Sequence, residues 1–320
     1  MTSQSIYSLK NIGLPAISCL DDFTLATRLS VGKIQFLSFA SDSLYKVYYL
    51  PKISGGIRQI AQPSRELKAL QGWILRNILD KLLSSPYSTG FEIGSSILDN
   101  AKPHVGSSYI LTIDLENFFP SIKANKVYGV FRSIGYNKEI STLFTNLCTY
   151  SGRLPQGAPT SPKLANLICS KLDSRIQGYV GPKGITYTRY ADDMTFSAHT
   201  ATKIQKTKQF INTIVSDENF IVNKFKTKVC GTKRQKKVTG LVLSENSVGI
   251  GRVKLREIRA QLHHLYTEKK DDYSSVNGIL SYVYSVDKKA YIKLYKYIDK
   301  LEVKYSDFAT KELINRKISK

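Results

Sequence analysis

The residues from Tyr109 to Leu115 read YILTIDL, and those from Tyr190 to Asp193 read YADD. The first stretch is rich in residues that favour extended structure, and it predicts a strand ending at Asp114. The second lies within residues 185–198, where two extended segments flank a tight turn, so it predicts a hairpin with both aspartates at the bend. If these strands are neighbours, three carboxylates meet at one edge of a sheet.

Three clustered carboxylates suit hard divalent cations. Joining a nucleotide to a growing strand uses two such ions, about 3.5–4 Å apart, beside the attacking and leaving oxygens. Magnesium prefers oxygen ligands, and cations relieve the repulsion between crowded carboxylates. We therefore interpret Asp114, Asp192 and Asp193 as ligands of two Mg²⁺ ions. The alternative is a solvated turn, because aspartate is common in turns.

Two further motifs lie between the strand and the hairpin. Phe118 and Phe119 follow the strand, and residues 154–162 read LPQGAPTSP. Ser161 and Pro162 predict the cap and first turn of a helix. The order of strand, aromatic pair, proline-rich loop and hairpin makes a chance arrangement improbable.

The preceding segments predict another hairpin and a long helix. Residues 45–51 and 57–63 read as strands on either side of a glycine turn, and their pairing carries Arg58 outward. Ser64 can cap a helix whose apolar residues recur at helical spacing as far as Leu82. That helix is expected to bury one face.

Both ends of the chain are predicted to be helical. Residues 21–40 read as two short helices around a turn near Gly32. A helical cap packed on the main body is favoured there over a helix-turn-helix, because that pattern is a weak signal. Beyond residue 250 the pattern indicates helices with apolar inner faces and basic outer faces, the latter carrying Lys254, Arg256 and Arg259.

The composition favours a polyanionic partner. Lysine and arginine number 47 against 25 acidic residues, which gives a net charge of +22. Nucleic acid is the first candidate. An anionic membrane is the rival, but no apolar run approaches the roughly 18 residues that span a bilayer, and no signal-peptide core is visible. The cysteines form no CxxC pair, which argues against zinc or a redox dithiol. We expect a cytoplasmic protein.

The motifs IDLENFFPSI, LPQGAPTSP and YADD resemble the successive palm motifs of reverse transcriptases. NAKPH at 100–104 and VTG at 238–240 resemble the two signatures of retron reverse transcriptases. The resemblance implies an α+β right-hand polymerase fold with fingers, palm and a small helical thumb. The expected parts are an N-terminal helical extension (1–40), the fingers and palm (41–240) and an RNA-binding thumb (241–320).

The resemblance also implies roles for individual residues. Asp114, Asp192, Asp193 and the Leu115 carbonyl would hold the metal ions. Phe119 would exclude a 2′-hydroxyl by sterics, and Lys226 matches a lysine that protonates pyrophosphate, with a solvated charge as the alternative. The residues expected along the nucleotide and template are Arg58 with the neighbouring Arg65, Gln156 and Gly157, the glycine because a bare backbone allows close approach.

A basic run without acidic residues precedes the VTG motif and should grip phosphate. Asn100 and His104 would serve RNA placement, and the alternative for His104 is a hydrogen-bonded histidine that fixes a turn. The other residues expected to contact RNA are Lys233, Arg234, Lys236, Lys237, Val238, Thr239, Gly240, Lys254, Arg256 and Arg259.

As the family implies, such an enzyme would copy part of its own structured noncoding RNA. Synthesis would begin from the 2′-hydroxyl of a guanosine and give branched, RNA-linked single-stranded DNA (msDNA) from deoxynucleoside triphosphates. An effector protein encoded nearby would join it in defence against phage. No ribonuclease H signature is visible, so template removal is expected to depend on a host ribonuclease H.

Three alternatives remain open. A group II intron maturase shares the palm motifs but normally carries a longer thumb and further segments. A noncatalytic RNA-binding scaffold would have no reason to keep three costly carboxylates. A palm-fold nucleotide cyclase would share the metal chemistry but would not use LPQGAPTSP or a basic thumb.

Overall fold

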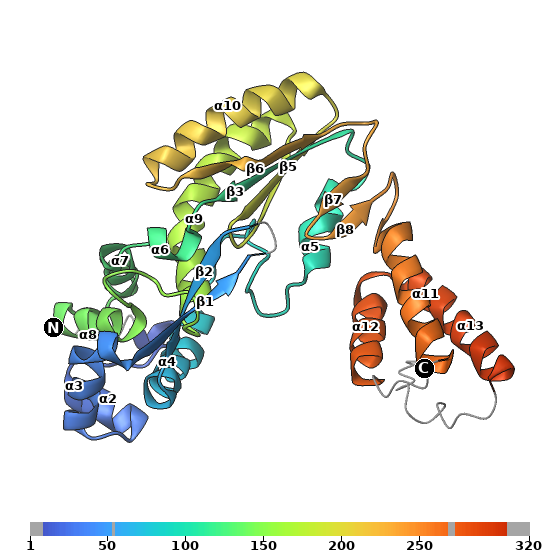
Figure 1. Cartoon of the computed structure of the whole chain (residues 1–320). Coiled ribbons are helices and arrows are strands. Elements are labelled where there is room, and N and C mark those ends of the chain that lie inside the picture. The colour runs from blue at the N-terminus through green and yellow to red at the C-terminus, as the bar shows by residue number, and fades with distance from the viewer. Residues whose placement is uncertain (1–8, 53–54, 268–272, 306–320) are drawn as a thin grey trace.

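The computed structural model describes residues 9–52, 55–267 and 273–305, and it mixes helices with antiparallel strands (Figure 1). The helices are α2 (Leu20–Thr27), α3 (Val31–Phe39), α4 (Arg65–Asn77), α5 (Ile97–Ala101), α6 (Phe118–Ser121), α7 (Ala124–Ile134), α8 (Lys138–Cys148), α9 (Ser161–Val180), α10 (Ala201–Asp217), α11 (Gly251–Thr267), α12 (Tyr273–Val286) and α13 (Lys288–Lys304). The strands are β1 (Tyr45–Pro51), β2 (Ile57–Pro63), β3 (Tyr109–Leu115), β4 (Thr186–Tyr190), β5 (Asp193–Ala198), β6 (Val222–Cys230), β7 (Lys236–Val238), β8 (Leu241–Leu243) and β9 (Val248–Gly249). The predicted α+β class is confirmed.

The central sheet has the strand order β4-β5-β3-β6, and all its neighbouring strands are antiparallel. Its strands β3, β4 and β5 occupy the positions predicted from YILTIDL and from the segment around YADD. Helices α9 and α10 pack against the sheet (Figure 1). Strand β3 lies between β5 and β6 and is largely buried. The start of β5 therefore lies beside the end of β3.

The hairpin β1–β2 also matches its prediction, although part of the predicted glycine turn, residues 53–54, lies outside the described residues. The Ser64 hydroxyl accepts a hydrogen bond from the Leu67 amide and caps α4. The prediction that this helix continues to Leu82 is wrong, because Ile78 leaves helical geometry and a 3₁₀ turn follows at residues 79–81. That turn buries the side chain of Leu79.

The N-terminal helices form a cap on the main body, as the favoured interpretation predicts. Phe23 of α2 is buried and packs edge-on against Phe144 of α8, with ring centroids 5.1 Å apart. The predicted turn near Gly32 is displaced, because Arg28 adopts the left-handed conformation (φ 59°) and Ser30 caps α3. Residues 1–8 of the predicted extension lie outside the described residues.

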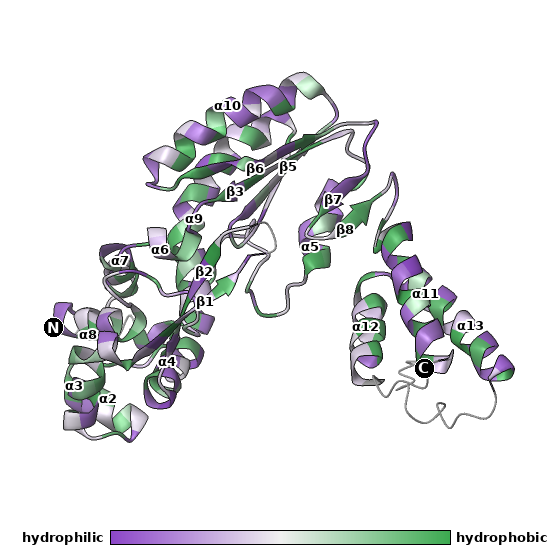
Figure 2. Cartoon of the chain, viewed as in Figure 1, coloured by the Kyte–Doolittle hydropathy of each residue, from purple (hydrophilic) through white to green (hydrophobic). Residues whose placement is uncertain are grey.

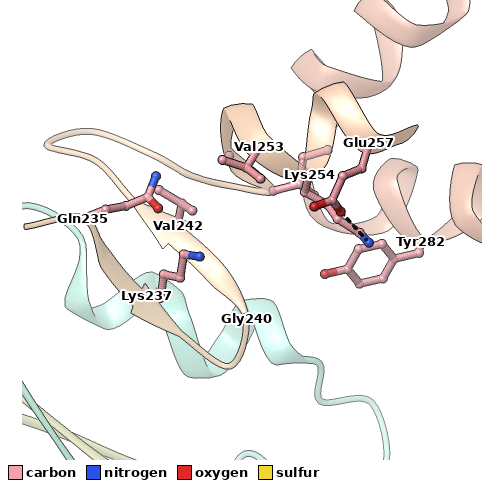
Figure 3. Close-up of a pocket in the computed structure, with 10 residues that line it drawn as sticks. Gln235, Lys237, Gly240, Val242, Val253, Lys254, Glu257 and Tyr282 are labelled. Carbon is pink, nitrogen blue, oxygen red and sulfur yellow. Dashed lines mark hydrogen bonds and ion pairs between the residues drawn. The ribbon is translucent and has the colours of Figure 1, made fainter. Parts of the chain in front are cut away.

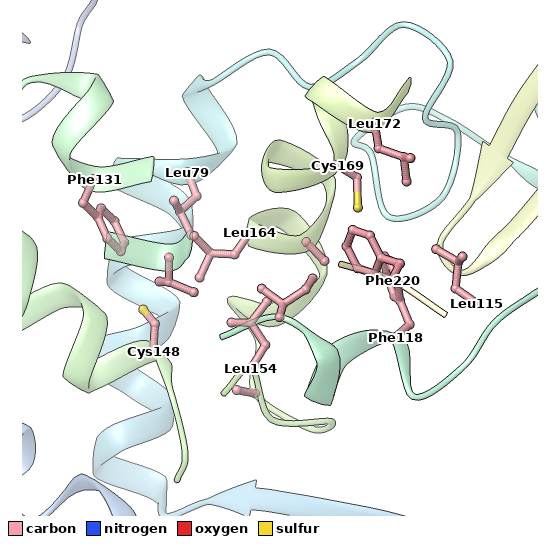
Figure 4. Close-up of a cluster of buried hydrophobic side chains, with 14 of the residues drawn as sticks. Leu79, Leu115, Phe118, Phe131, Cys148, Leu154, Leu164, Cys169, Leu172 and Phe220 are labelled. Carbon is pink, nitrogen blue, oxygen red and sulfur yellow. The ribbon is translucent and has the colours of Figure 1, made fainter. Parts of the chain in front are cut away.

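The main core surrounds α9 (Figure 4). Phe118 of α6 is buried there and stacks on Phe220, with ring centroids 6.0 Å apart. This contact anchors the short helix that follows β3. Phe119, the next residue of α6, is therefore held close to the end of β3.

A second core joins the small sheet β7-β8-β9 to helices α11, α12 and α13. Hydrophobic and hydrophilic residues alternate around these helices, which is the pattern of a bundle with one buried face on each helix (Figure 2). The predicted border at residue 240 falls in the turn between β7 and β8, and the helices begin at Gly251. Residues 306–320 of the predicted thumb are outside the described part. Among the described helices, none is long and apolar enough to cross a membrane.

Candidate active site

The end of the central sheet brings together the three aspartates named in the sequence analysis. Asp114, the penultimate residue of β3, faces Asp193, the first residue of β5, as its cross-strand partner. Side chains in such pairs lie about 4.5–5.5 Å apart at Cβ. The Leu115 amide donates to the Asp192 carbonyl at 3.1 Å, which ties the strand end to the YADD turn. Carboxylates separated along the chain therefore share one sheet edge.

The charges at this edge repel one another. Burial, followed by the charge of Asp114, raises the pKa of Asp192. Desolvation by the surrounding protein, followed by the charges of Asp192 and Asp114, raises the pKa of Asp193 to about 6. The side chain of Asp193 is nevertheless open to solvent, so a cation could reach it. A raised pKa means that the carboxylate form is disfavoured unless positive charge is supplied.

Lys226 supplies part of that charge. Its ammonium lies 2.9 Å from Oδ2 of Asp114, and this hydrogen bond raises the pKa of Lys226. The pairing of β3 with β6 shifts register between Thr112 and Asp114, and the Asn223 side chain accepts from the Lys226 amide in that irregular stretch. Bulges of this kind redirect side chains beside active sites. Here the bulge places a lysine from an otherwise exposed strand at the aspartates.

The donor set fits divalent cations in its chemistry. In residues 9–52, 55–267 and 273–305 no preformed group of three or more His, Cys, Asp or Glu side chains could hold a metal ion as placed. Instead, a lysine cation occupies Asp114. The carboxylates repel one another, and one of them already binds a cationic side chain. Such a cluster is suited to divalent cations that prefer oxygen ligands.

The residues predicted to contact the nucleotide come from α6, the hairpin β1–β2, the start of α4 and the loop at residues 154–162. Phe119 is half-buried on α6, and Arg58 is exposed on β2, where its charge acts to lower the pKa of Asp192. Arg65 is exposed in the first turn of α4, at the base of the same hairpin. The hairpin is joined to residues 154–162 by a hydrogen bond from the Ala61 amide to the Gln156 carbonyl at 2.9 Å.

Gly157 packs closely against the backbone of the hairpin β1–β2. Gly157 has φ 138°, and a Cβ there would lie 2.6 Å from the carbonyl oxygen of Ala61. The backbone of β2 therefore makes a close approach that excludes a side chain at this position. Glycine is required at this position for packing between the loop and the hairpin.

A buried network behind the YADD turn was missed by sequence reasoning. Arg189 is fully buried and pairs in a bidentate manner with Asp173 of α9, through Nε and Nη2, each at 2.8 Å from a carboxylate oxygen. Its Nη1 donates to the carbonyl of Ala191 at 3.1 Å and to Oδ1 of Asn166 at 3.0 Å. Tyr187 donates to the same carboxylate at 2.7 Å. The guanidinium thus fixes the backbone next to the two aspartates.

Two residues of the NAKPH motif are buried, which contradicts direct contact with RNA. Asn100 and His104 have no exposed surface. The ring nitrogens of His104 lie 2.7 Å from Ser197 Oγ and 2.8 Å from Thr188 Oγ1, and burial lowers its pKa to about 4. His104 therefore matches the alternative interpretation, a neutral histidine that joins a turn to the central sheet.

Val238 is likewise a core residue and not a surface contact, since it is 1% exposed in the second core. Its neighbours differ from it. Thr239 is partly exposed and donates to the Ile97 carbonyl at 3.2 Å, whereas Gly240 is exposed. Lys236 donates to the carbonyl of Ser107 at 2.7 Å. The basic residues of the predicted set that are exposed are Lys233, Arg234, Lys237, Lys254, Arg256 and Arg259.

A cavity of about 200 Å³ lies between the small sheet and α11 (Figure 3). Lys237 of β7 and Lys254 of α11 lie on either side of it, with Tyr282 of α12 beside Lys254. The backbone of Gly240 forms part of the wall. The turn of the VTG motif and the start of the helical bundle thus line the same cavity, with one lysine from each.

An α+β domain that gathers aspartates at a sheet edge beside a lysine and an aromatic residue has the features of a nucleic acid polymerase. Residues 50–243 match the family model described as reverse transcriptase (RNA-dependent DNA polymerase). The chain is 54% identical over 301 residues to the retron Ec86 reverse transcriptase of Escherichia coli, covering 93% of this chain and 94% of that protein. It is 34% identical over 301 residues to the retron Mx65 reverse transcriptase of Myxococcus xanthus, with 86% and 70% covered. The chain belongs to the retron reverse transcriptases, and it is an RNA-directed DNA polymerase.

Proposed function

We propose that this enzyme copies part of its own structured noncoding RNA into branched, RNA-linked single-stranded DNA, primed from a guanosine 2′-hydroxyl. The hairpin β1–β2 with α4 would form the fingers, the central sheet the palm, and α11–α13 the thumb. The observation that carries the catalytic part of the proposal is the juxtaposition of Asp114 with Asp193 across neighbouring strands. Membership of the retron family supports the branched product.

Asp114, Asp192, Asp193 and the Leu115 carbonyl would hold two Mg²⁺ ions. When bound, these ions would stabilise the charge that develops on the attacking and leaving oxygens. Lys226 holds a proton at its Nζ, 2.9 Å from Asp114, and would give that proton to the departing pyrophosphate. Arg58, exposed on the fingers hairpin, would pair with the triphosphate, and Gln156 would lie along the template.

DNA synthesis is expected to fall as the pH decreases through about 6, at low Mg²⁺ concentration. The pKa of Asp193 is raised to about 6, so below that pH the carboxyl is protonated and no longer available as a ligand. Because metal and proton compete, more Mg²⁺ should move the midpoint to lower pH. Rates measured from pH 5 to 8 at several Mg²⁺ concentrations test this. A pH midpoint of the synthesis rate that does not change with Mg²⁺ concentration would contradict the assignment of Asp193 as a metal ligand.

Phe119→Val is expected to admit ribonucleotides. The Phe119 ring, half-buried beside the end of β3, would clash with a 2′-hydroxyl, and a smaller side chain removes that clash. The ratio of kcat/KM for dCTP to that for CTP should fall by at least about 10-fold, in the range typical of steric discrimination. Single-nucleotide incorporation on a fixed primer and template gives both values. An unchanged ratio would show that Phe119 is not the gate.

The basic surface around VTG and the thumb would bind the folded RNA. Arg234→Gln with Lys237→Gln should lower the slope of log K against log salt by about 0.7–0.9 for each phosphate that the protein no longer neutralises. Lys206→Gln with Lys208→Gln removes the same charge from exposed positions on α10 and serves as the control. The test is to measure RNA binding by both double variants from 50 to 300 mM salt. Equal slopes of log K against log salt for the two variants would refute a specific RNA-binding surface.

The proposed partners follow from the family. The enzyme would stay bound to its RNA and DNA product, act with an effector protein encoded nearby in defence against phage, and rely on a host ribonuclease H to remove the template. The enzyme would meet its transcript and deoxynucleoside triphosphates in the cytoplasm.

The direct test incubates the protein with the structured RNA encoded beside its gene, Mg²⁺ and radiolabelled deoxynucleotides. A product that resists separation of RNA from DNA until a debranching enzyme is added would support 2′-priming. Linear extension of any annealed primer, without a branch, would favour a maturase-like enzyme. No incorporation would point to an RNA-binding scaffold.

A further inference from the structure

Phe91 combines a strained backbone with an exposed aromatic ring. Its φ is 61°, a region that bulky residues rarely adopt, and its side chain is 47% exposed. Strain of this kind persists only where the surroundings enforce it, and it concentrates at functional sites. The contacts of Phe91 therefore indicate which function this backbone conformation could support.

The loop that carries Phe91 is fixed to the YADD hairpin from both sides. The Thr89 amide donates to the Arg189 carbonyl at 2.8 Å, and Asn166 Nδ2 donates to the Gly90 carbonyl at 2.7 Å. A Cβ at Gly90 would lie 2.7 Å from the Ala191 nitrogen, so only glycine lets the loop lie against the turn.

On the other side of Phe91, the Glu92 carboxylate pairs with Lys163 at 2.6 Å, and both side chains are largely buried. Asn166 Nδ2 also donates to Glu92 Oε1 at 2.7 Å. The backbone flanking Phe91 is thus held by α9, the helix that also supports the YADD turn through Asp173.

The ring of Phe91 bridges two residues of the active site. Its centroid lies 6.3 Å from that of Phe119 and 6.1 Å from that of Tyr190, both within the range of interacting aromatic pairs. Phe119 also contacts Phe118 at 5.3 Å, and Phe118 is anchored in the main core. Phe119 therefore pairs both with a buried ring and with the ring of Phe91.

We propose that Phe91 is a positioning residue for sugar selection, which holds the Phe119 ring in the rotamer that excludes a 2′-hydroxyl. A steric gate discriminates only while it cannot swing away, and side chains change rotamer readily when a neighbouring wall is removed. Phe118 forms one wall, and Phe91 forms the other. This inference rests on the proposed role of Phe119, so its test contains that role as a separate arm.

The test measures the ratio of kcat/KM for dCTP to that for CTP in single-nucleotide incorporation. Phe91→Ala should lower this ratio by about 10-fold, towards the value of Phe119→Val. Phe91→Tyr keeps the ring and should keep most of the discrimination. Phe91→Gly removes the ring together with the backbone strain, so it should lower the ratio while leaving the melting temperature equal or higher. Ile93→Ala alters an exposed neighbour in the same loop and is the control.

The arms separate the possible failures. If Phe119→Val relaxes selection but Phe91→Ala and Phe91→Gly leave the ratio unchanged, Phe91 has no part in selection, although the gate stands. If Phe119→Val leaves the ratio unchanged, both the gate and this inference are wrong. An equal loss of activity with both nucleotides would show a merely structural contact and would overturn the proposal. In the Phe119→Val background, Phe91→Ala should add little, since the ring that it holds is gone.

Discussion

The double substitution Asp192→Asn and Asp193→Asn is expected to abolish DNA synthesis while RNA affinity changes by less than about two-fold. Removing a single preorganised charge-stabilising group costs about 10²–10³-fold in other enzymes, and two lost ligands should exceed that. The exposed lysines and arginines that we propose bind RNA are far along the chain from this turn, so RNA binding should persist. Primer extension and filter binding on the same preparation measure both. Loss of both functions together would mean that the pair is structural.

The same variant should melt at a higher temperature than the parent at pH 7.5 without Mg²⁺. The pKa values of Asp192 and Asp193 are raised in the folded protein, the latter to about 6. A raised acid pKa means that the fold favours the protonated form, so the stabilisation present at low pH is lost as the pH rises through about 6. Asparagine removes this penalty. The gain should therefore be larger at pH 7.5 than at pH 5, and an equal gain at both values would contradict the electrostatic account.

Arg189→Ala is expected to destabilise the protein severely, because it leaves the Asp173 carboxylate buried without its partner. Breaking a buried pair in this way costs about 3–5 kcal/mol. The Ala191 carbonyl also loses its donor, so synthesis should fall by about 10²-fold even where the protein stays folded, as small displacements at an active site do. Urea denaturation and single-turnover synthesis at low temperature measure the two effects.

A second variant separates stability from positioning. Asp173→Leu, Tyr187→Phe and Arg189→Met together replace the buried charges with apolar groups of similar size, and such replacements are often neutral or stabilising. This triple variant should recover much of the stability but not the activity, because no donor reaches the Ala191 carbonyl. Recovery of full activity would show that the network serves stability alone.

The strand and the turn that carry the three aspartates could be predicted from the sequence, because the patterns that indicate them are local. A β-rich strand that ends in Asp114 and a tight turn at YADD can both be read from a few neighbouring residues. The order of these elements along the chain led us to expect that the aspartates lie close together. The register of β3 with β5, in which Asp114 is opposite Asp193, agrees with that expectation. The hairpin carrying Arg58 and the cap at Ser64 were predicted for the same reason.

The features that sequence reasoning missed depend on tertiary contacts. Arg189 looks like any basic residue until α9 brings Asp173 beside it, and nothing local distinguishes a buried arginine from an exposed one. For His104 the sequence left two roles open, RNA placement and the fixing of a turn, because its partners come from the distant strands β4 and β5. Lys226 was named only through the family resemblance, because its contact with Asp114 depends on a bulge in β6 that no local pattern predicts.

Anomalous diffraction from crystals of the enzyme with a primer–template, a deoxynucleotide and Mn²⁺ would locate the metal ions that the three aspartates are proposed to hold. Our account predicts two manganese peaks about 4 Å apart, with Asp114 and the aspartates of the YADD turn as their protein ligands. Manganese bound elsewhere, or a complete nucleotide complex in which these carboxylates contact no metal, would contradict it.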